Sequence, residues 1–220
     1  MNADRLARLY RWVEYAAFGR TLERCRFERL GELAEARRVL VLGEGDGRFV
    51  NRLVRENGAA RVVIMEASTR MVRVAKQRLG ATERVEWRMG DVLAAAWPEG
   101  PFDAVVTHFF LDCFREEEAR QVVRQAAERL KPGGLWVVSE FCEPEAGCRR
   151  LHARAWLGVM YLFFRWTTGL RTNRLPDWRG LLERAGFRCV ARRQWRWGLV
   201  ASEVWRRGKT EESREGSRML

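Results

Sequence analysis

Short apolar runs alternate with amphipathic stretches along most of the chain. Five of these runs predict buried strands: RRVLVLG (37–43), ARVVIME (60–66), RVEWRMG (84–90), FDAVVTHFF (102–110) and LWVVSEF (135–141). Stretches with helical spacing lie between them, at 47–57, 69–79 and 114–130. Ser68 precedes the second helix as an N-cap, Gly80 stops it, and KPGG stops the third. Strands that alternate with helices predict a parallel sheet with helices on both faces.

The two ends of the chain depart from this alternation. Residues 3–30 are predicted to be helical because one apolar face repeats at helical spacing, through Leu6, Leu9, Tyr10, Val13 and Ala17. Near the other end, a helix at 178–185 precedes two strands, 187–195 and 198–207. Their very short connection predicts a hairpin, since parallel strands need a crossover. The expected fold class is therefore α/β, doubly wound, and mostly parallel with an antiparallel last strand.

The length of 220 residues and a hydrophobic share of 47% suit one domain with a sizeable core. We expect a helical cover at 1–36, the sheet domain at 37–206, a lid-like insertion at 148–175 and a polar, disordered tail at 207–220. The chain has no apolar run of the roughly 18 residues that a membrane span needs. Its charged start lacks the apolar core of a signal peptide, which predicts a cytoplasmic protein.

The cysteines and the charge narrow the possible functions. Five cysteines are scattered without a CxxC pair, and only His108 and His152 are available to join them, so neither a metal site nor a disulfide framework is expected. The net charge of +12 leaves nucleic acid open as a partner. The basic residues are nearly all arginines that are interleaved with glutamates, which favours a solvated basic surface.

The segment VLVLGEGDGRF places three glycines between the first strand and the first helix of the sheet domain. The dinucleotide pattern G-x-G-x-x-G does not fit, because Arg48 or Val50 stands where its third glycine would fall. Gly43, Gly45 and Gly47 instead form G-x-G-x-G, which turns tightly and lets a ligand lie against bare backbone. The amides that begin the following helix can hold a carboxylate.

Two acids end neighbouring strands of the predicted sheet. Glu66 lies about twenty residues after the glycine loop, where an acid can accept hydrogen bonds from two ribose hydroxyls. Asp91, in MGD, is placed to accept from the exocyclic amine of adenine. The ends of parallel strands form the usual ligand crevice. The alternatives are a solvated Glu66, an Asp91 that caps a short helix, and an empty glycine turn.

Five segments in this order, VLVLGEGDGRF, VVIMEAS, RMGDVL, FDAVVTHFFLDCF and LKPGGLWVVSEF, resemble the motifs of class I S-adenosylmethionine-dependent methyltransferases over residues 37–206. The resemblance implies a Rossmann-like, seven-stranded sheet. It also implies S-adenosylmethionine as cofactor, with S-adenosylhomocysteine as product and no metal. Val41 departs from the pattern, because the family often has an acid there. Glu44 and Asp46 are predicted to compensate by facing the methionine ammonium.

The resemblance also implies roles for single residues. The three glycines would line the methionine part, Glu66 would hold the ribose, and His108 and Phe109 would lie near the sulfonium and the substrate. Ala67 and Met71 would flank the adenine. The predicted cofactor-binding set is Gly43, Glu44, Gly45, Asp46, Gly47, Glu66, Ala67, Met71, Gly90, Asp91, Val92, His108 and Phe109.

Methyl transfer from a sulfonium mainly needs alignment and exclusion of water. A general base is needed only where the acceptor must lose a proton. His108 and Asp112 are the candidates; the alternatives are a packed or cofactor-contacting histidine and an aspartate that caps the helix near Phe114. THFF stands where amino-group methyltransferases carry (Asp/Asn)-Pro-Pro-Tyr, which disfavours methylation of exocyclic amines.

An uncharged stretch, 155–164, lies between Arg154 and Arg165. It indicates what kind of molecule accepts the methyl group. We expect it to cap a lipophilic pocket; a membrane surface, dimerisation and plain core packing stay open. The layout is similar to ubiquinone/menaquinone-type methyltransferases, which favours O- or C-methylation of a hydrophobic small molecule. An RNA methyltransferase and a binding module without catalysis are the alternatives. The predicted substrate-binding residues are Tyr10, Tyr15, Phe141, Trp156, Met160 and Tyr161.

Overall fold

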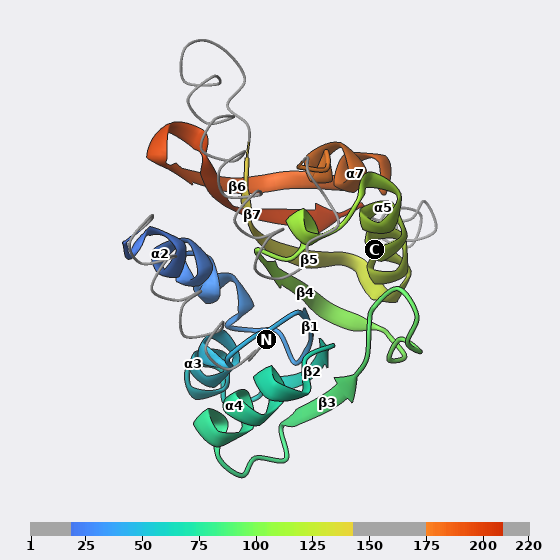
Figure 1. Cartoon of the computed structure of the whole chain (residues 1–220). Helices are drawn as coiled ribbons and strands as arrows, with labels where there is room; N and C mark the ends of the chain where they lie inside the picture. Colours follow the sequence, from blue (N-terminus) through green and yellow to red (C-terminus); the bar gives the residue numbers. More distant parts are fainter. Residues whose placement is uncertain (1–18, 143–174, 209–220) are drawn as a thin grey trace, which may run out of the picture.

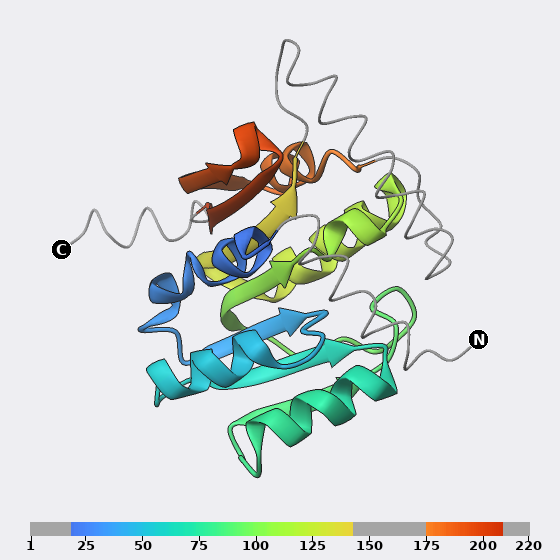
Figure 2. The same ribbon diagram turned by 60° about the vertical axis from the view of Figure 1, so that its left-hand side comes forward.

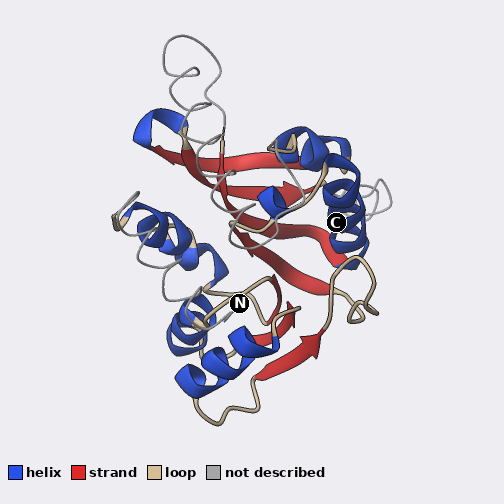
Figure 3. Ribbon diagram, viewed as in Figure 1, coloured by secondary structure: helices blue, strands red, loops and turns tan. Residues whose placement is uncertain are grey.

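A computed structural model describes residues 19–142 and 175–208 of the chain. Seven strands form one sheet in the order β3-β2-β1-β4-β5-β7-β6 (Figures 1 and 3). Strands β1 to β5 pair in parallel, whereas β7 is antiparallel to both of its neighbours, β5 and β6. The predicted fold class is therefore confirmed. The strands are β1 (Arg38–Leu42), β2 (Arg61–Glu66), β3 (Val85–Met89), β4 (Phe102–His108), β5 (Leu130–Phe141), β6 (Phe187–Trp195) and β7 (Val200–Arg207).

Helices cover both faces of this sheet. Figures 1 and 2 show α2, α3 and α4 on one side and α5 and α7 on the other. Their bounds are α2 (Thr21–Phe27), α3 (Arg48–Glu56), α4 (Thr69–Leu79), α5 (Glu116–Arg129) and α7 (Trp178–Arg184). Three short 3-10 helices are η1 (Leu30–Leu33), η2 (Leu111–Cys113) and η3 (Arg196–Gly198).

Alternate residues of each central strand enter different cores. In β1, Leu40 and Leu42 join the core under α5 and α7, while Val39 and Val41 join the core under α3. This period of two follows from strand geometry. Val41 is 1% exposed, so an acid at this position would lose its hydration. This packing explains why Val41 stands at this position in place of the acid that the family often has.

Asp103, in β4, joins three strands at the opposite edge of the sheet from the glycine loop. Its Oδ2 accepts from the backbone amides of Arg37 and Arg38 at 3.0 and 2.7 Å, and its Oδ1 pairs with Lys131 Nζ at 2.6 Å. Burial opposes the charged form of Asp103, but these partners outweigh it and lower the pKa of the carboxyl. The acid therefore stabilises the amino ends of β1, β4 and β5 together.

Two predicted boundaries are wrong. The helix expected at 3–30 ends at Phe27 in its described part, and η1 follows; the turn between them lets Leu30 and Leu33 pack in the core beside α3. The strand expected at 135–141 begins at Leu130, which pairs with Phe102 before the ladder resumes at Leu135. The segment KPGG (131–134) lies between these two pairs and interrupts the regular register of β4 and β5.

Much of the predicted cover, lid and tail lies outside the described residues. Of the cover at 1–36, the structure describes 19–36; of the lid at 148–175 it describes Leu175 alone; of the tail at 207–220 it describes 207–208. In the described ranges, no helix is both long and apolar enough to cross a membrane.

Candidate cofactor site

The carboxyl ends of β1, β2 and β4 meet at one edge of the sheet, because Leu42 pairs with both Met65 and Thr107. The glycine loop follows β1 there. Glu66 ends β2, and its Oε2 accepts from the Gly45 amide at 3.1 Å while its Oε1 accepts from the Ser68 amide at 2.9 Å. The structure thus brings the predicted loop and the predicted ribose-binding acid into direct contact.

All three loop glycines have left-handed backbone, with φ of 67° at Gly43, 71° at Gly45 and 81° at Gly47. A Cβ at Gly43 would overlap the Phe110 ring, and one at Gly47 would lie 2.7 Å from the Ala75 Cβ. A Cβ at Gly45 would meet nothing within 4 Å. Gly43 and Gly47 therefore permit packing within the protein, whereas Gly45 offers open backbone to a ligand.

Glu44 and Asp46 have partners inside the protein. Glu44 is 8% exposed, and its Oε1 accepts from the amide of Val50 in the first turn of α3 at 3.0 Å. Burial raises its pKa to about 7. Asp46 Oδ2 lies 3.1 Å from Arg48 Nε and 3.2 Å from Arg78 NH1. The start of α3 thus holds the chain's own carboxylate, and a contact of either acid with an ammonium stays a prediction.

The residues predicted around the adenine differ in exposure. Ala67 is exposed and Met71 is half-buried, and the Met71 amide donates to Ser68 Oγ at 3.2 Å, which confirms Ser68 as the N-cap of α4. Asp91 is exposed, and its Oδ1 accepts from the Leu93 amide at 2.9 Å. Asp91 thus caps a single turn, as in the alternative reading, and its contact with adenine stays a prediction.

Gly90 and Val92, the sequence neighbours of Asp91, lie in different environments. The Gly90 amide donates to the backbone oxygen of Glu66 at 3.1 Å, which ties the end of β3 to the end of β2. The Val92 side chain is 5% exposed and packs in the core under α5. Only the backbone of Val92 is therefore left for an adenine edge.

His108 ends β4 in an apolar setting. It is 7% exposed, its ring lies edge-on to Phe49 with centroids 4.5 Å apart, and neither ring nitrogen has a hydrogen-bond partner among the described residues. Burial, aided by the nearby charge of Arg26, lowers its pKa well below 6.5. The imidazole is therefore neutral at pH 7, with two unsatisfied nitrogens.

Phe109, next along the chain, has a left-handed backbone with φ of 53°. Such strain in a residue with a large side chain is concentrated at functional sites. Its ring lies 5.2 Å from that of Phe141, which is 4% exposed and packs against α2 and β7. Phe141, a predicted substrate contact, is therefore a buried core residue whose ring packs near that of Phe109. Its contact with a substrate stays a prediction.

Sequence reasoning missed Glu140 in β5. Its Oε1 accepts from the amides of Phe110 and Leu111 at 2.8 and 2.7 Å, and its Oε2 has no partner among the described residues. It is 0% exposed. An acid inside the apolar run LWVVSEF was the available signal, since a charged residue is almost never fully buried without a function or a partner. Glu140 fixes the loop that presents Phe110 to Gly43.

Asp112, the second candidate base, is a buried acid whose charge acts on Glu140. It is 7% exposed and lies in η2, and burial raises its pKa to about 6. Burial and the charge of Asp112 raise the pKa of Glu140 well above 4.5. Arg115 is the N-cap of α5, and its amide donates to Glu118 at 2.9 Å. Asp112 as a helix cap is therefore wrong; Asp112 and Glu140 are two buried acids whose pKa values are both raised.

The remaining predicted residues, Tyr10, Tyr15, Trp156, Met160 and Tyr161, lie outside the described residues. Within 19–142 and 175–208, no group of three or more His, Cys, Asp or Glu is arranged to hold a metal ion. The residues at the carboxyl edge fit an adenosyl sulfonium cofactor. Gly45 offers open backbone, Glu66 presents a carboxylate beside it, and His108 keeps unpaired nitrogens at the next strand end.

Residues 39–134 match the family model described as "Methyltransferase domain". The resemblance to S-adenosylmethionine-dependent methyltransferases is thus supported over this stretch, and S-adenosylmethionine is the cofactor that it implies. An O-methyltransferase family protein from Burkholderia thailandensis has a similar structure, with a TM-score of 0.63 and 21% identity over 88% of this chain and 59% of that chain. That likeness supports the fold of the methyltransferase domain.

Two curated relatives are methyltransferases whose names refer to menaquinone or ubiquinone. Demethylmenaquinone methyltransferase from Tropheryma whipplei (strain Twist) is 37% identical over 109 residues, 48% of this chain and 42% of that protein. Ubiquinone/menaquinone biosynthesis C-methyltransferase UbiE from Pseudomonas putida (strain GB-1) is 27% identical over 158 residues, 70% of this chain and 60% of that protein. The matches thus span less than two thirds of either relative's length.

The contrast between Gly45 and Gly47 is testable. Alanine at Gly45 adds a methyl group where the protein leaves space, so we expect S-adenosylmethionine affinity to fall at least tenfold with a stability loss of about 1 kcal/mol from the left-handed backbone. Alanine at Gly47 collides with Ala75, so stability should fall by more. Calorimetric titration and thermal unfolding measure the two effects. Equal affinity losses at equal stability would contradict the assignment of Gly45 to the ligand.

The role of Glu140 predicts a difference between two substitutions. Glu140→Ala leaves two buried amides unpaired and should cost about 2–5 kcal/mol of unfolding free energy. Glu140→Gln keeps an acceptor and should cost about 1 kcal/mol or less. Denaturant unfolding at several pH values measures both.

The pH dependence of stability follows from the raised pKa values of the acid pair. Between the unfolded pKa values and the folded ones, only the native protein holds the extra proton, so stability falls as pH rises. Glu140→Gln should flatten this fall. A pH slope equal to that of the wild type would show that Glu140 does not take up this proton.

Proposed function

We propose that this protein transfers the methyl group of S-adenosylmethionine to a hydrophobic small molecule, at oxygen or carbon. The observation that carries the proposal is the hydrogen bond from the open backbone of Gly45 to Glu66 at the carboxyl edge of the sheet. This hydrogen bond supports the proposal, because a carboxylate beside accessible backbone suits a ribose with two hydroxyls. The relatives named for quinone precursors support a small, apolar acceptor.

S-adenosylmethionine supplies an activated methyl group on a sulfonium. The residues of this chain then have three tasks: to bind, to orient and to exclude water. Glu66 would hold the ribose while staying fixed by the Gly45 and Ser68 amides. Phe109 and Phe110 form an apolar wall after β4, which keeps water from the transfer path.

His108 is the proposed base where the acceptor is a hydroxyl or an acidic carbon. Its lowered pKa keeps the imidazole unprotonated at neutral pH, so a nitrogen is free to accept a proton. Asp112 is buried in the loop after β4, where its charge acts on Glu140, and we assign it to positioning that loop. The proposed acceptor contacts remain Tyr10, Tyr15, Phe141, Trp156, Met160 and Tyr161.

The alternatives have less support. The names of the curated relatives refer to menaquinone and ubiquinone, which are small molecules, and not to RNA. A binding module without catalysis would keep the cofactor contacts and lack methyl transfer.

Reduced cysteines support a cytoplasmic location as part of the proposal, since Cys25, Cys113, Cys142 and Cys189 are free.

The cofactor part of the proposal is tested at Glu66. Loss of paired ribose hydrogen bonds should weaken S-adenosylmethionine binding by about 1–3 kcal/mol in Glu66→Ala, as measured by calorimetry. Glu86→Ala is the control, because Glu86 is an acid of the adjacent strand β3 that pairs with Arg88 on the surface. A radiolabelled methyl assay on quinols, phenols and RNA then identifies the acceptor. Unchanged affinity in Glu66→Ala, or transfer to RNA alone, would refute the proposal.

The base is tested by His108→Phe, which keeps an aromatic ring against Phe49. We expect kcat to fall at least 100-fold with little change in cofactor affinity. Wild-type activity should not decline as pH falls from 8 to about 6.5, because the imidazole stays neutral over that range. A folded His108→Phe protein with full kcat would assign His108 to packing.

A further inference from the structure

The hairpin of β6 and β7 ends in an exposed tryptophan. Trp197, in η3, is 69% exposed, more than Met89 at 45% or Val190 at 50%. Its backbone is left-handed, with φ of 56°, and so is that of Arg196, with φ of 51°. Two successive strained residues hold an indole and a guanidinium outside the fold. Strain of this kind persists where it serves a function.

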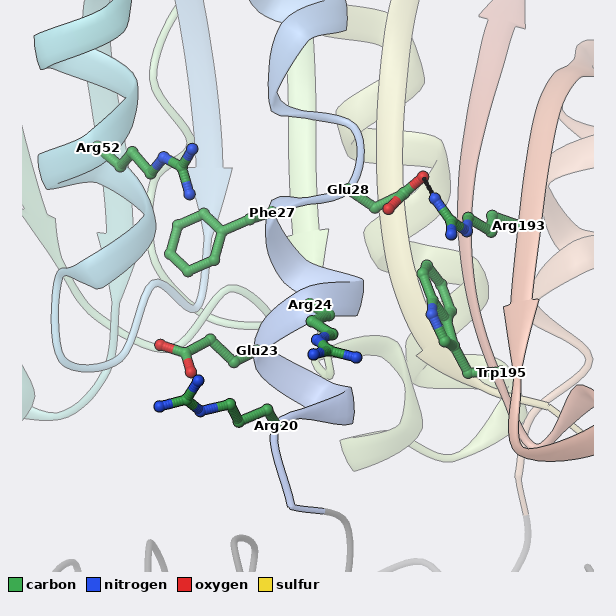
Figure 4. Close-up of a pocket in the computed structure, with 8 residues that line it drawn as sticks. All are labelled: Arg20, Glu23, Arg24, Phe27, Glu28, Arg52, Arg193 and Trp195. Atoms are coloured by element: carbon green, nitrogen blue, oxygen red, sulfur yellow. Dashed lines mark hydrogen bonds and ion pairs between the residues drawn. The ribbon is translucent and has the colours of Figure 1, made fainter.

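A basic groove of about 610 Å³ lies beside this tip (Figure 4). Arg193 pairs with Glu28 at 2.7 Å, and Arg52 pairs with Glu56 at 2.6 Å. Arg20 and Arg24 make no ion pair with the part of the chain that the structure describes. The groove is lined by Arg20, Glu23, Arg24, Phe27, Glu28, Arg52, Arg193 and Trp195.

The groove and the tip belong to one surface. Trp195 lines the groove and is followed directly by Arg196 and Trp197. On the inner side, Leu22 and Cys25 of α2 share a core with Leu199 and Val200 at the start of β7. The arginines of α2 and the tryptophan of the tip are therefore held in a fixed relation.

The chain's own charge does not complement this surface. The net charge is +12. Residues 1–18, which precede α2, contain three arginines and two acids, and residues 143–174 contain six arginines and two glutamates. Residues 209–220 contain three basic residues and three glutamates. Since none of these three segments carries a net negative charge, the complementary negative charge has to come from another molecule.

We propose that Trp197, Arg196, Arg20 and Arg24 dock this protein onto an anionic lipid bilayer. Indole rings partition to the headgroup level of a membrane, and arginines there contact lipid phosphates. A projecting tip suits a bilayer, which it enters from one side. A nucleic acid backbone tracking the groove would instead meet the carboxylates of Glu23 and Glu28. Docking is independent of the acceptor and of methyl transfer.

The test is flotation of the full chain with phosphatidylcholine vesicles and with vesicles in which part of this lipid is replaced by phosphatidylglycerol. Binding should require phosphatidylglycerol and weaken with salt. Each arginine near the surface contributes about fivefold, so Arg20→Gln with Arg24→Gln should weaken binding roughly 30-fold. Trp197→Ala should weaken it about tenfold. Thermal unfolding confirms that each variant is folded.

The matched control is Arg120→Gln with Arg124→Gln, which removes two charges at the same spacing from α5, on the other face of the sheet. This variant should bind like the wild type. Equal loss in the control, binding independent of phosphatidylglycerol, or binding to RNA without binding to vesicles would overturn the proposal. Cofactor titration on the same variants separates the two proposals, because docking variants should keep wild-type S-adenosylmethionine affinity.

Discussion

The parallel pairing of β1 with both β2 and β4 is the constraint on which the site depends. It forces the segments that follow these strands to meet at one edge, although they are far apart in the sequence. The glycine loop, Glu66 and His108 are adjacent for this reason alone. Gly45 is then fixed by its hydrogen bond to Glu66. The site therefore needs no long side chains to span it, since the backbone itself forms one of its walls.

Buried acids give this edge its rigidity at an electrostatic cost. Glu44 holds the start of α3, and Glu140 holds the loop after β4. Each accepts backbone amides that would otherwise be unpaired in the interior, which offsets part of the desolvation of the carboxyl. The remainder is relieved by protonation, as the raised pKa values of Glu44, Glu140 and Asp112 indicate. The same low-polarity setting keeps His108 neutral, so one physical cause serves both structure and chemistry.

Because one fold hosts many reactions, function depends on particular residues and not on the fold alone. Val41 is an example of a residue that departs from the family pattern. The family often has an acid at this position, but here the side chain is packed under α3. The acid is found three residues later, in Glu44, whose Oε1 accepts from an amide in the first turn of α3. The domain thus keeps the family architecture while distributing charge in its own way around the glycine loop.

The sequence by itself determined the order of strands and helices, the hairpin at the end and the glycine–acid pair, since these follow from local periodicity, turn chemistry and short-range spacing. Only the tertiary structure decided where Glu140 and Asp112 lie, that Gly45 alone of the three glycines is open, and that Phe141 is a core residue. Each of these depends on contacts between residues distant in the chain, such as Glu140 with Phe110 or Gly47 with Ala75. Periodicity states which face a residue takes, but burial and hydrogen bonding are decided by what the rest of the fold places opposite it.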